Sequence, residues 1–265
     1  MNDRALAALS VLGIWWLSTG IVLRMVWLGR TTLRIAVSGA VGVAGLVALF
    51  YSSRTATTGA AYVAFGGALA VWAWHELMFL LGVITGPRKL PAPAGVRGWQ
   101  RFRFATAAVI HHEVALAVTL GAIILLSWGE PNQVGTWTFE VLWVMRLSAK
   151  LNVFLGVRNL SEQFVPDHLR YMLSYFRRAR MNALMPFTVV AASGEVVHLA
   201  IASLAADATA FVVVSRSLVA TLLALAVLEH VFLALPVPDA VLWRWATRVQ
   251  RQHAKPVPVL TVEAP

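Results

Sequence analysis

The sequence has no cysteine and few charged residues for its length. Only 13% of its 265 residues are Asp, Glu, Lys or Arg, whereas 59% are hydrophobic. The lack of cysteine excludes disulfides, thiolate zinc sites, iron–sulfur clusters and covalently attached c-type haem. An average soluble domain carries about 25% charged residues. The low charge content and the mean hydropathy of +0.72 therefore predict a membrane protein.

Seven stretches are long and apolar enough to cross about 30 Å of hydrocarbon. They cover residues 5–28, 33–52, 58–84, 103–128, 135–157, 183–206 and 209–235. A segment in lipid must satisfy its own backbone hydrogen bonds, and these stretches lack the alternation of barrel strands, so each is predicted to be a helix. The predicted fold is all-α: a polytopic membrane protein whose seven transmembrane helices form one domain over residues 1–236.

The basic residues gather on one side of these spans. One set of alternate connections holds 16 arginines and lysines, and the other set holds only Arg4 and Arg54. Under the positive-inside rule this asymmetry predicts a multi-pass protein of the bacterial inner membrane with a periplasmic N-terminus and a cytoplasmic C-terminus. It also accounts for the net charge of +10 without a nucleic-acid partner.

Two further segments on the predicted cytoplasmic side are amphipathic. Residues 166–180 and 239–252 each place apolar side chains on one helix face and arginines on another. We expect helices that lie in the membrane interface, held by apolar burial and by anionic lipid. Docking onto the cytoplasmic face of a partner protein is the alternative. The last residues, 253–265, are rich in proline and are predicted to form a flexible tail.

Ionisable residues inside the predicted spans are the candidate functional residues. Such residues are costly in hydrocarbon and usually face the interior of the bundle with a partner. Most of them fall at a similar depth below the predicted cytoplasmic boundary, so we expect one shared polar layer. Its members are His75, Glu76, His111, His112, Glu113, Arg146, Lys150, Glu195, His198, Glu229 and His230.

Three interpretations of this layer remain open. In the first, Arg146 and Lys150 share one face of a helix and neutralise glutamates in a structural ion-pair network. In the second, iron, manganese or zinc is held by imidazole and carboxylate ligands, drawn from Glu76, His112, Glu113, Glu195, His198, Glu229 and His230. Only Glu195 and His198 have the Glu-x-x-His spacing of di-iron bundles. In the third, the axial ligand of a tetrapyrrole metal is a histidine, drawn from His75, His111, His112, His198 and His230.

Several longer stretches resemble a known family. They are WHELMFLLGVITGPRK at 74–89, RFRFATAAVIHHE at 101–113, PNQVGTWTFEVLWVMRLSAKLNVFLGVRNL at 131–160 and PDHLRYMLSYFRRARMN at 166–182. Together they resemble the photosynthetic complex assembly protein family called PuhE, from purple phototrophic bacteria. The resemblance implies a protein of the inner (intracytoplasmic) membrane that works with reaction-centre and antenna subunits or with pigment-synthesis proteins. It brings no catalytic or binding residues with it.

The expected function is therefore assembly of bacterial photosynthetic reaction-centre and core-antenna complexes. Bacteriochlorophyll, or a metal bound by His and Glu, is the candidate cofactor. The alternative is a membrane-bound, metal-dependent enzyme of bacteriochlorophyll synthesis, which would need bound iron or manganese. A knockout distinguishes the two, since loss of an enzyme accumulates a precursor and loss of an assembly factor leaves precursors normal.

Overall fold

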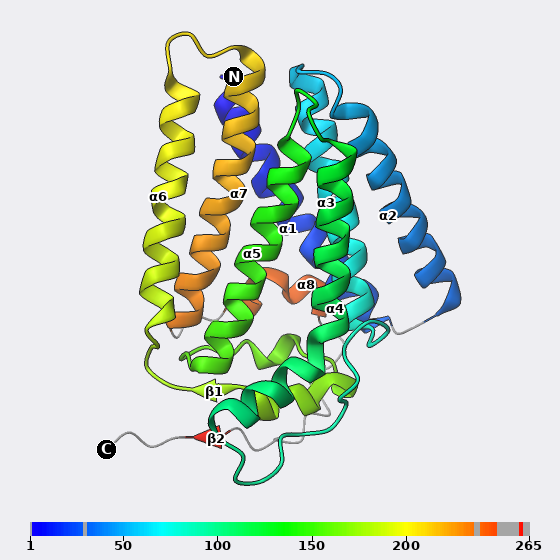
Figure 1. Ribbon diagram of the computed structural model, residues 1–265, viewed down its shortest axis with the longest axis vertical. Helices are drawn as coiled ribbons and strands as arrows, with labels where there is room; N and C mark the ends of the chain where they lie inside the picture. The colour runs from blue at the N-terminus through cyan, green and yellow to red at the C-terminus, as the bar shows by residue number, and fades with distance from the viewer. Residues whose placement is uncertain (1, 29–30, 236–238, 248–259, 262–265) are drawn as a thin grey trace.

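Seven long α-helices make up most of the part of the chain that the structure describes (Figure 1). This computed structural model describes residues 2–28, 31–235, 239–247 and 260–261. The helices are α1 (Asp3–Trp27), α2 (Thr32–Ser52), α3 (Thr58–Leu80), α4 (Gly98–Leu126), α5 (Val134–Leu155), α6 (Leu184–Leu204) and α7 (Ala210–Ala234). Each end lies within five residues of its predicted boundary.

Six of these helices, all except α5, are long and apolar enough to cross a membrane. The chain is therefore an all-α polytopic membrane protein. Helix α5 has 22 residues, but Glu140, Arg146 and Lys150 lower its hydropathy. A seventh span at α5 stays a prediction.

Helix α5 lies in the middle of the bundle, where it packs against α3, α7 and α4. Helices α2 and α6 lie at opposite sides, α2 against α3 and α6 against α7 (Figure 1). The largest apolar cluster sits between the inner helices and includes the buried Phe65, Leu116, Phe139 and Leu218. The charged residues of α5 thus lie on a helix that contacts three other helices, although Val144 and Leu147 on the same helix are exposed.

Small residues allow α2 and α3 to approach closely. A Cβ atom on Gly45 would lie 2.7 Å from the carbonyl oxygen of Gly67, and one on Gly67 would lie 2.9 Å from that of Gly45. Helices in lipid associate through such close backbone packing, because apolar side chains gain little by leaving lipid. These two glycines therefore fix the position of α2 against α3.

The basic end of the bundle, where α1, α3, α5 and α7 terminate, carries short elements between the long helices. The segment predicted as a regular amphipathic helix over 166–180 forms a 3₁₀ helix, η2 (Asp167–Tyr175), after a shorter one, η1 (Glu162–Phe164). Buried Leu169 and Met172 of η2 pack with Phe79, and a ring nitrogen of His168 lies 2.9 Å from the carbonyl oxygen of Leu80. The segment therefore follows the protein surface at the end of α3, which explains its departure from a regular helix.

The C-terminal region is described only in part. The helix predicted at 239–252 appears as η3 (Asp239–Trp243) and α8 (Arg244–Thr247), and residues 248–252 lie outside the described residues. Trp243 is buried, and its ring centroid lies 5.2 Å from that of Trp15. In the predicted tail, β2 (Leu260–Thr261) pairs in parallel with β1 (Arg177–Arg178), and the other residues from 253 to 265 are not described.

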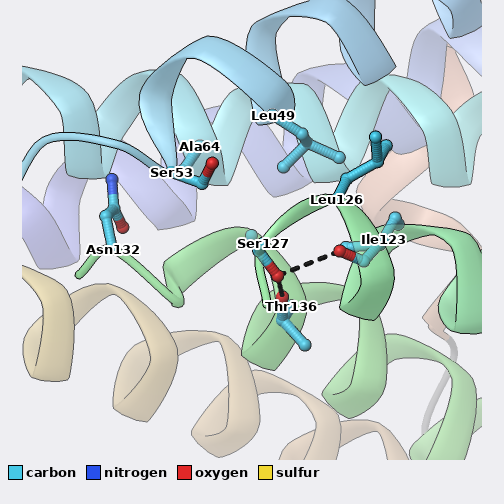
Figure 2. A pocket seen from close by; sticks show the side chains of 9 residues that line it. Leu49, Ser53, Ala64, Ile123, Leu126, Ser127, Asn132 and Thr136 are labelled. Atoms are coloured by element: carbon cyan, nitrogen blue, oxygen red, sulfur yellow. Dashed lines mark hydrogen bonds between the residues drawn. The ribbon is translucent and has the colours of Figure 1, made fainter. Parts of the chain in front are cut away.

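The opposite end is closed by polar contacts between connections (Figure 2). The side-chain amide of Asn132 donates to the carbonyl of Ser52 at 2.8 Å. The hydroxyls of Ser127 and Thr136 lie 2.8 Å apart, as Figure 2 shows. Asn132, Ser127 and Thr136 border a cavity of about 10 Å³. Such a volume holds one water molecule at most, so we place no ligand site there.

Candidate functional site

The site begins at a bend in α4 near the basic end (Figure 1). The backbone N–H of His112 donates to the carbonyl of Thr85 at 3.0 Å, and the N–H of Arg88 donates to the carbonyl of Ala107 at 3.1 Å. In a regular helix these groups bond four residues along the same helix, and a group inserted into that ladder is a known cause of kinks. A Cβ on Gly86 would lie 2.6 Å from the carbonyl carbon of Ala108, so the insertion requires glycine.

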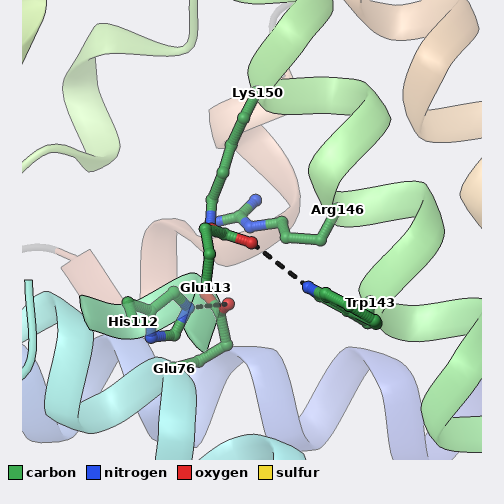
Figure 3. A network of polar contacts seen from close by, with 6 residues as sticks. All are labelled: Glu76, His112, Glu113, Trp143, Arg146 and Lys150. Atoms are coloured by element: carbon green, nitrogen blue, oxygen red, sulfur yellow. Dashed lines mark hydrogen bonds and ion pairs between the residues drawn. The ribbon is translucent and has the colours of Figure 1, made fainter. Parts of the chain in front are cut away.

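Two ion pairs join α3, α4 and α5 beside this bend (Figure 3). Arg146 Nη2 lies 3.1 Å from Glu76 Oε2, and Lys150 Nζ lies 2.5 Å from Glu113 Oε1. Trp143 Nε1 donates to the second oxygen of Glu113 at 3.2 Å. The three α5 residues share one helix face, because they follow one another at intervals of three and four. We call the six residues of Figure 3 the charge cluster: Glu76, His112, Glu113, Trp143, Arg146 and Lys150.

The charge cluster balances its formal charges within the bundle. The two carboxylates are 11% and 13% exposed for Glu76 and Glu113, and each faces one cation from α5. Leaving Glu76, Glu113 or Lys150 unpaired would strand a largely buried charge, at a cost of about 3–5 kcal/mol, whereas the Arg146 side chain is 42% exposed. The two ion pairs link α5 to α3 and α4.

His112 is the most buried member of the cluster, and the contact of its imidazole with Glu76 is too long for a hydrogen bond. The residue is 0% exposed, and Nε2 lies 3.6 Å from Glu76 Oε1, beyond hydrogen-bonding distance. Among the described residues neither ring nitrogen nor this carboxylate oxygen has a hydrogen-bond partner. Buried polar atoms are nearly always hydrogen-bonded. The space between His112 and Glu76 is therefore the place where the cluster has unused hydrogen-bonding atoms for a proton, a water molecule or a ligand.

The other buried histidines bond to hydroxyl groups. His75 Nε2 lies 2.9 Å from Thr119 Oγ1 of α4. His230 Nε2 lies 3.1 Å from Ser148 Oγ of α5, which in turn lies 3.0 Å from Thr188 Oγ1 of α6. Sequence reasoning did not single out Ser148 or Thr188. The available signal was that hydroxyl side chains within spans commonly hydrogen-bond across helices.

The expected layer assembles only in part. Glu195 and His198 lie exposed on the outside of α6, and His111 is exposed on α4 although the next residue, His112, is buried. Glu229 is exposed and accepts a hydrogen bond from the indole of Trp15 at 3.0 Å. Residues at the same depth in the membrane can still face different directions, because depth does not fix the rotation of a helix about its axis. Adjacent residues of a helix point about 100° apart. In the described chain no three His, Asp or Glu residues are grouped so as to hold a metal ion.

A separate cleft of about 560 Å³ opens at the basic end. It lies between the end of α1, the segment after α3 and η2, and is bordered by the apolar Val26 and Leu169 and by the polar Lys89 and Tyr171. Burial raises the pKa of the Tyr171 phenol above its ordinary value, so this hydroxyl stays protonated at neutral pH. The volume lies within the range of small-molecule sites, about 300–1,000 Å³, although none of the predicted histidines lines it.

Sequence comparisons give one family and one curated relative. The sequence model of a family described as "Protein of unknown function (DUF3623)" matches residues 1–254. A protein of Rhodobacter capsulatus named "Uncharacterized 30.4 kDa protein in puhA 5'region" is 38% identical over 255 residues, covering 92% of this chain and 91% of the relative. No solved structure matches the chain.

Proposed function

We propose, from the premise that this chain belongs to the DUF3623 family, that it is a membrane-embedded assembly factor for photosynthetic reaction-centre and core-antenna complexes. One observation carries the proposal: a relative that is 38% identical is named for its position in the puhA 5′ region. That name supports a photosynthesis-gene context, with the photosynthetic membrane as the site of action. The resemblance of residues 74–182 to the PuhE assembly family points the same way.

The distribution of polar residues supports assembly more than catalysis. Residues suggested as metal ligands are divided between the charge cluster and the outer face of α6, where Glu195 and His198 are exposed. Each acid of the charge cluster forms an ion pair with one cation of α5, Arg146 or Lys150. A bundle held in this way suits a scaffold that presents its surfaces to other membrane subunits, and no observation specifically favours the metal-dependent enzyme.

The proposed orientation places the basic end in the cytoplasm and the N-terminus in the periplasm. The arginines of the connections at that end would then face the cytoplasm, the side on which loops are enriched in Lys and Arg. Arg97, Arg158 and Arg178 are examples. Anionic lipid is the membrane component that this face attracts. Reaction-centre or antenna subunits, or pigment-synthesis proteins, are the proposed protein partners.

Handling of bacteriochlorophyll or of a metal is a finer part of the proposal, and His112 is the residue to test for it. Its two nitrogens lack hydrogen-bond partners at a fully buried position, and a neutral imidazole can be the axial ligand of a tetrapyrrole metal. Elemental analysis and absorbance of the purified protein, compared between the wild type and His112→Leu, test this part. A bound metal or pigment lost only in the variant is expected, and equal content in both would refute it.

A deletion strain tests the function itself. We expect the deletion to lower the near-infrared absorbance of reaction centres and core antenna while extracted pigment precursors stay at wild-type levels. Complementation with the wild-type gene at native expression should restore the complexes. Accumulation of one precursor together with loss of bacteriochlorophyll would favour the enzyme instead. Normal complexes in the deletion strain would overturn the proposal.

A further inference from the structure

The outer face of α6 carries an acid and an imidazole near the middle of an apolar helix. Glu195 lies eleven residues after Leu184 and nine before Leu204, roughly 16 and 14 Å along the axis at about 1.5 Å per residue. Its side chain is 53% exposed and that of His198 is 69% exposed. Since α6 is long and apolar enough to span a membrane, both side chains lie near the centre of the hydrocarbon. Ionisable groups at that depth are costly and usually have a partner.

The pair leaves part of its hydrogen-bonding capacity unused. His198 Nδ1 lies 3.2 Å from both carboxylate oxygens of Glu195. In every protonation state of the pair the second ring nitrogen, Nε2, can form one hydrogen bond of its own. Within the described residues His198 Nε2 has no hydrogen-bond partner. Glu195 thus orients a ring that presents an unused polar nitrogen to the membrane.

The exposed apolar residues of α6 form a heptad seam. They follow one another at intervals of three and four on the side opposite the buried Met185, Ala192 and Leu199. The seam consists of Phe187, Val190, Gly194, Val197, Ile201 and Leu204. This spacing gives the a and d positions of left-handed helix pairs, the commonest packing in membranes. A Cβ on Gly194 would meet nothing within 4 Å, so a second helix has room to approach.

The polar residues beside the seam are complementary to those of a second copy. With Gly194 at an a position, Ser193 is a g residue and His198 is the next e residue. In a parallel helix pair the g residue of one chain lies beside an e residue of the other. Copies of one multi-span protein share one orientation in the membrane, because loop charge sets it. A two-fold axis would therefore bring Ser193 of each copy to His198 of the other, and would do so twice.

We propose that the outer face of α6 is the interface of a homodimer within the membrane, in which the Ser193 hydroxyl of each copy hydrogen-bonds with His198 Nε2 of the other; a hydroxyl can donate or accept. The apolar seam alone would suit lipid equally well, as the exposed face of α2 does. What distinguishes α6 is the oriented imidazole and the serine at the matching position. The inference does not depend on the assembly function, because it concerns self-association only.

Cross-linking tests the interface directly, because the chain has no cysteine. Val197→Cys places one thiol on the seam, and Val118→Cys places one at an exposed position of α4 as the matched control. After copper–phenanthroline oxidation of membranes at native expression, we expect a disulfide-linked pair of chains from Val197→Cys only. No dimer from Val197→Cys, equal dimer from both variants, or a link from Val197→Cys to a different protein would each overturn the proposal.

The hydrogen-bonded register has its own test. Loss of two equivalent interhelical hydrogen bonds should weaken dimerisation by about tenfold, measured by energy transfer between labelled full-length chains diluted in detergent. Ser193→Ala and His198→Leu should both show this effect. Ser10→Ala is the control, since that hydroxyl bonds the carbonyl of Leu6 in its own helix. A constant that stays within twofold for Ser193→Ala would overturn the proposed pairing.

Discussion

The charge cluster and the Glu195–His198 pair place similar residues in similarly apolar helices, yet their surroundings differ. In the cluster, Glu113 faces Lys150 and Trp143 from a neighbouring helix. On α6, the one hydrogen-bond partner of the Glu195 side chain among the described residues is His198 of its own helix, and Glu195 remains 53% exposed. This difference indicates that the charge cluster stabilises the fold of one chain, whereas the Glu195–His198 pair is available to bind a second chain.

The largest effect should come from breaking the first group. Glu113→Gln removes the negative charge that Lys150 meets at 2.5 Å and leaves a buried cation without its counter-ion. We expect the free energy of unfolding to fall by about 3–5 kcal/mol, measured by steric trapping in bicelles. The double variant Glu113→Gln/Lys150→Met should recover much of that loss. A double variant as unstable as the single one would show that the pair is not what stabilises the bundle.

The next largest effect is expected at Gly86, in the segment whose backbone is inserted at the bend in α4. Gly86→Ala adds a Cβ atom that would lie 2.6 Å from the carbonyl carbon of Ala108. This contact is with the backbone, which cannot move aside as the end of a flexible side chain can. We expect a loss of about 1–3 kcal/mol, the usual cost of overpacking, in the same unfolding measurement. Gly121→Ala is the control, since a Cβ there meets nothing within 4 Å. Equal stability of the two variants would contradict the close approach at Gly86.

The sequence predicted the positions of the helices well, but it predicted poorly which side chains of each helix face the interior of the bundle. Long apolar runs located all seven helices within five residues, because the length of a span is set by the thickness of hydrocarbon. The interval between Arg146 and Lys150 correctly indicated a shared face. Depth could not tell that His112 faces inward while His111 does not. The contact of Thr85 with His112 joins residues far apart in the chain, and nothing in the local pattern indicates it.

His112 combines features of the two groups. It is buried like the other residues of the charge cluster, but its ring nitrogens have no hydrogen-bond partner in the described chain. His112→Leu removes two nitrogens that have no hydrogen-bond partner and places an apolar side chain of similar size against Phe79. Replacing unsatisfied polar atoms in this way is close to neutral, so we expect a change of at most about 1 kcal/mol in stability. If reaction-centre and antenna absorbance in the cell nevertheless falls, His112 acts in function. Unchanged absorbance would leave it a packing residue.

The smallest effect should come from Glu195→Gln, which repeats the substitution made at Glu113. In the described chain this side chain forms no ion pair with Lys or Arg and no hydrogen bond to another helix, so the monomer loses no interhelical polar interaction. We expect the free energy of unfolding of the monomer to change by less than about 0.5 kcal/mol, as for an ordinary surface site. The measurement is made at a dilution where chains are single. A loss as large as that of Glu113→Gln would mean that α6 uses Glu195 to hold its own bundle. A small loss in the monomer, together with weaker cross-linking at Val197→Cys in membranes, would place the role of Glu195 between two copies of the chain.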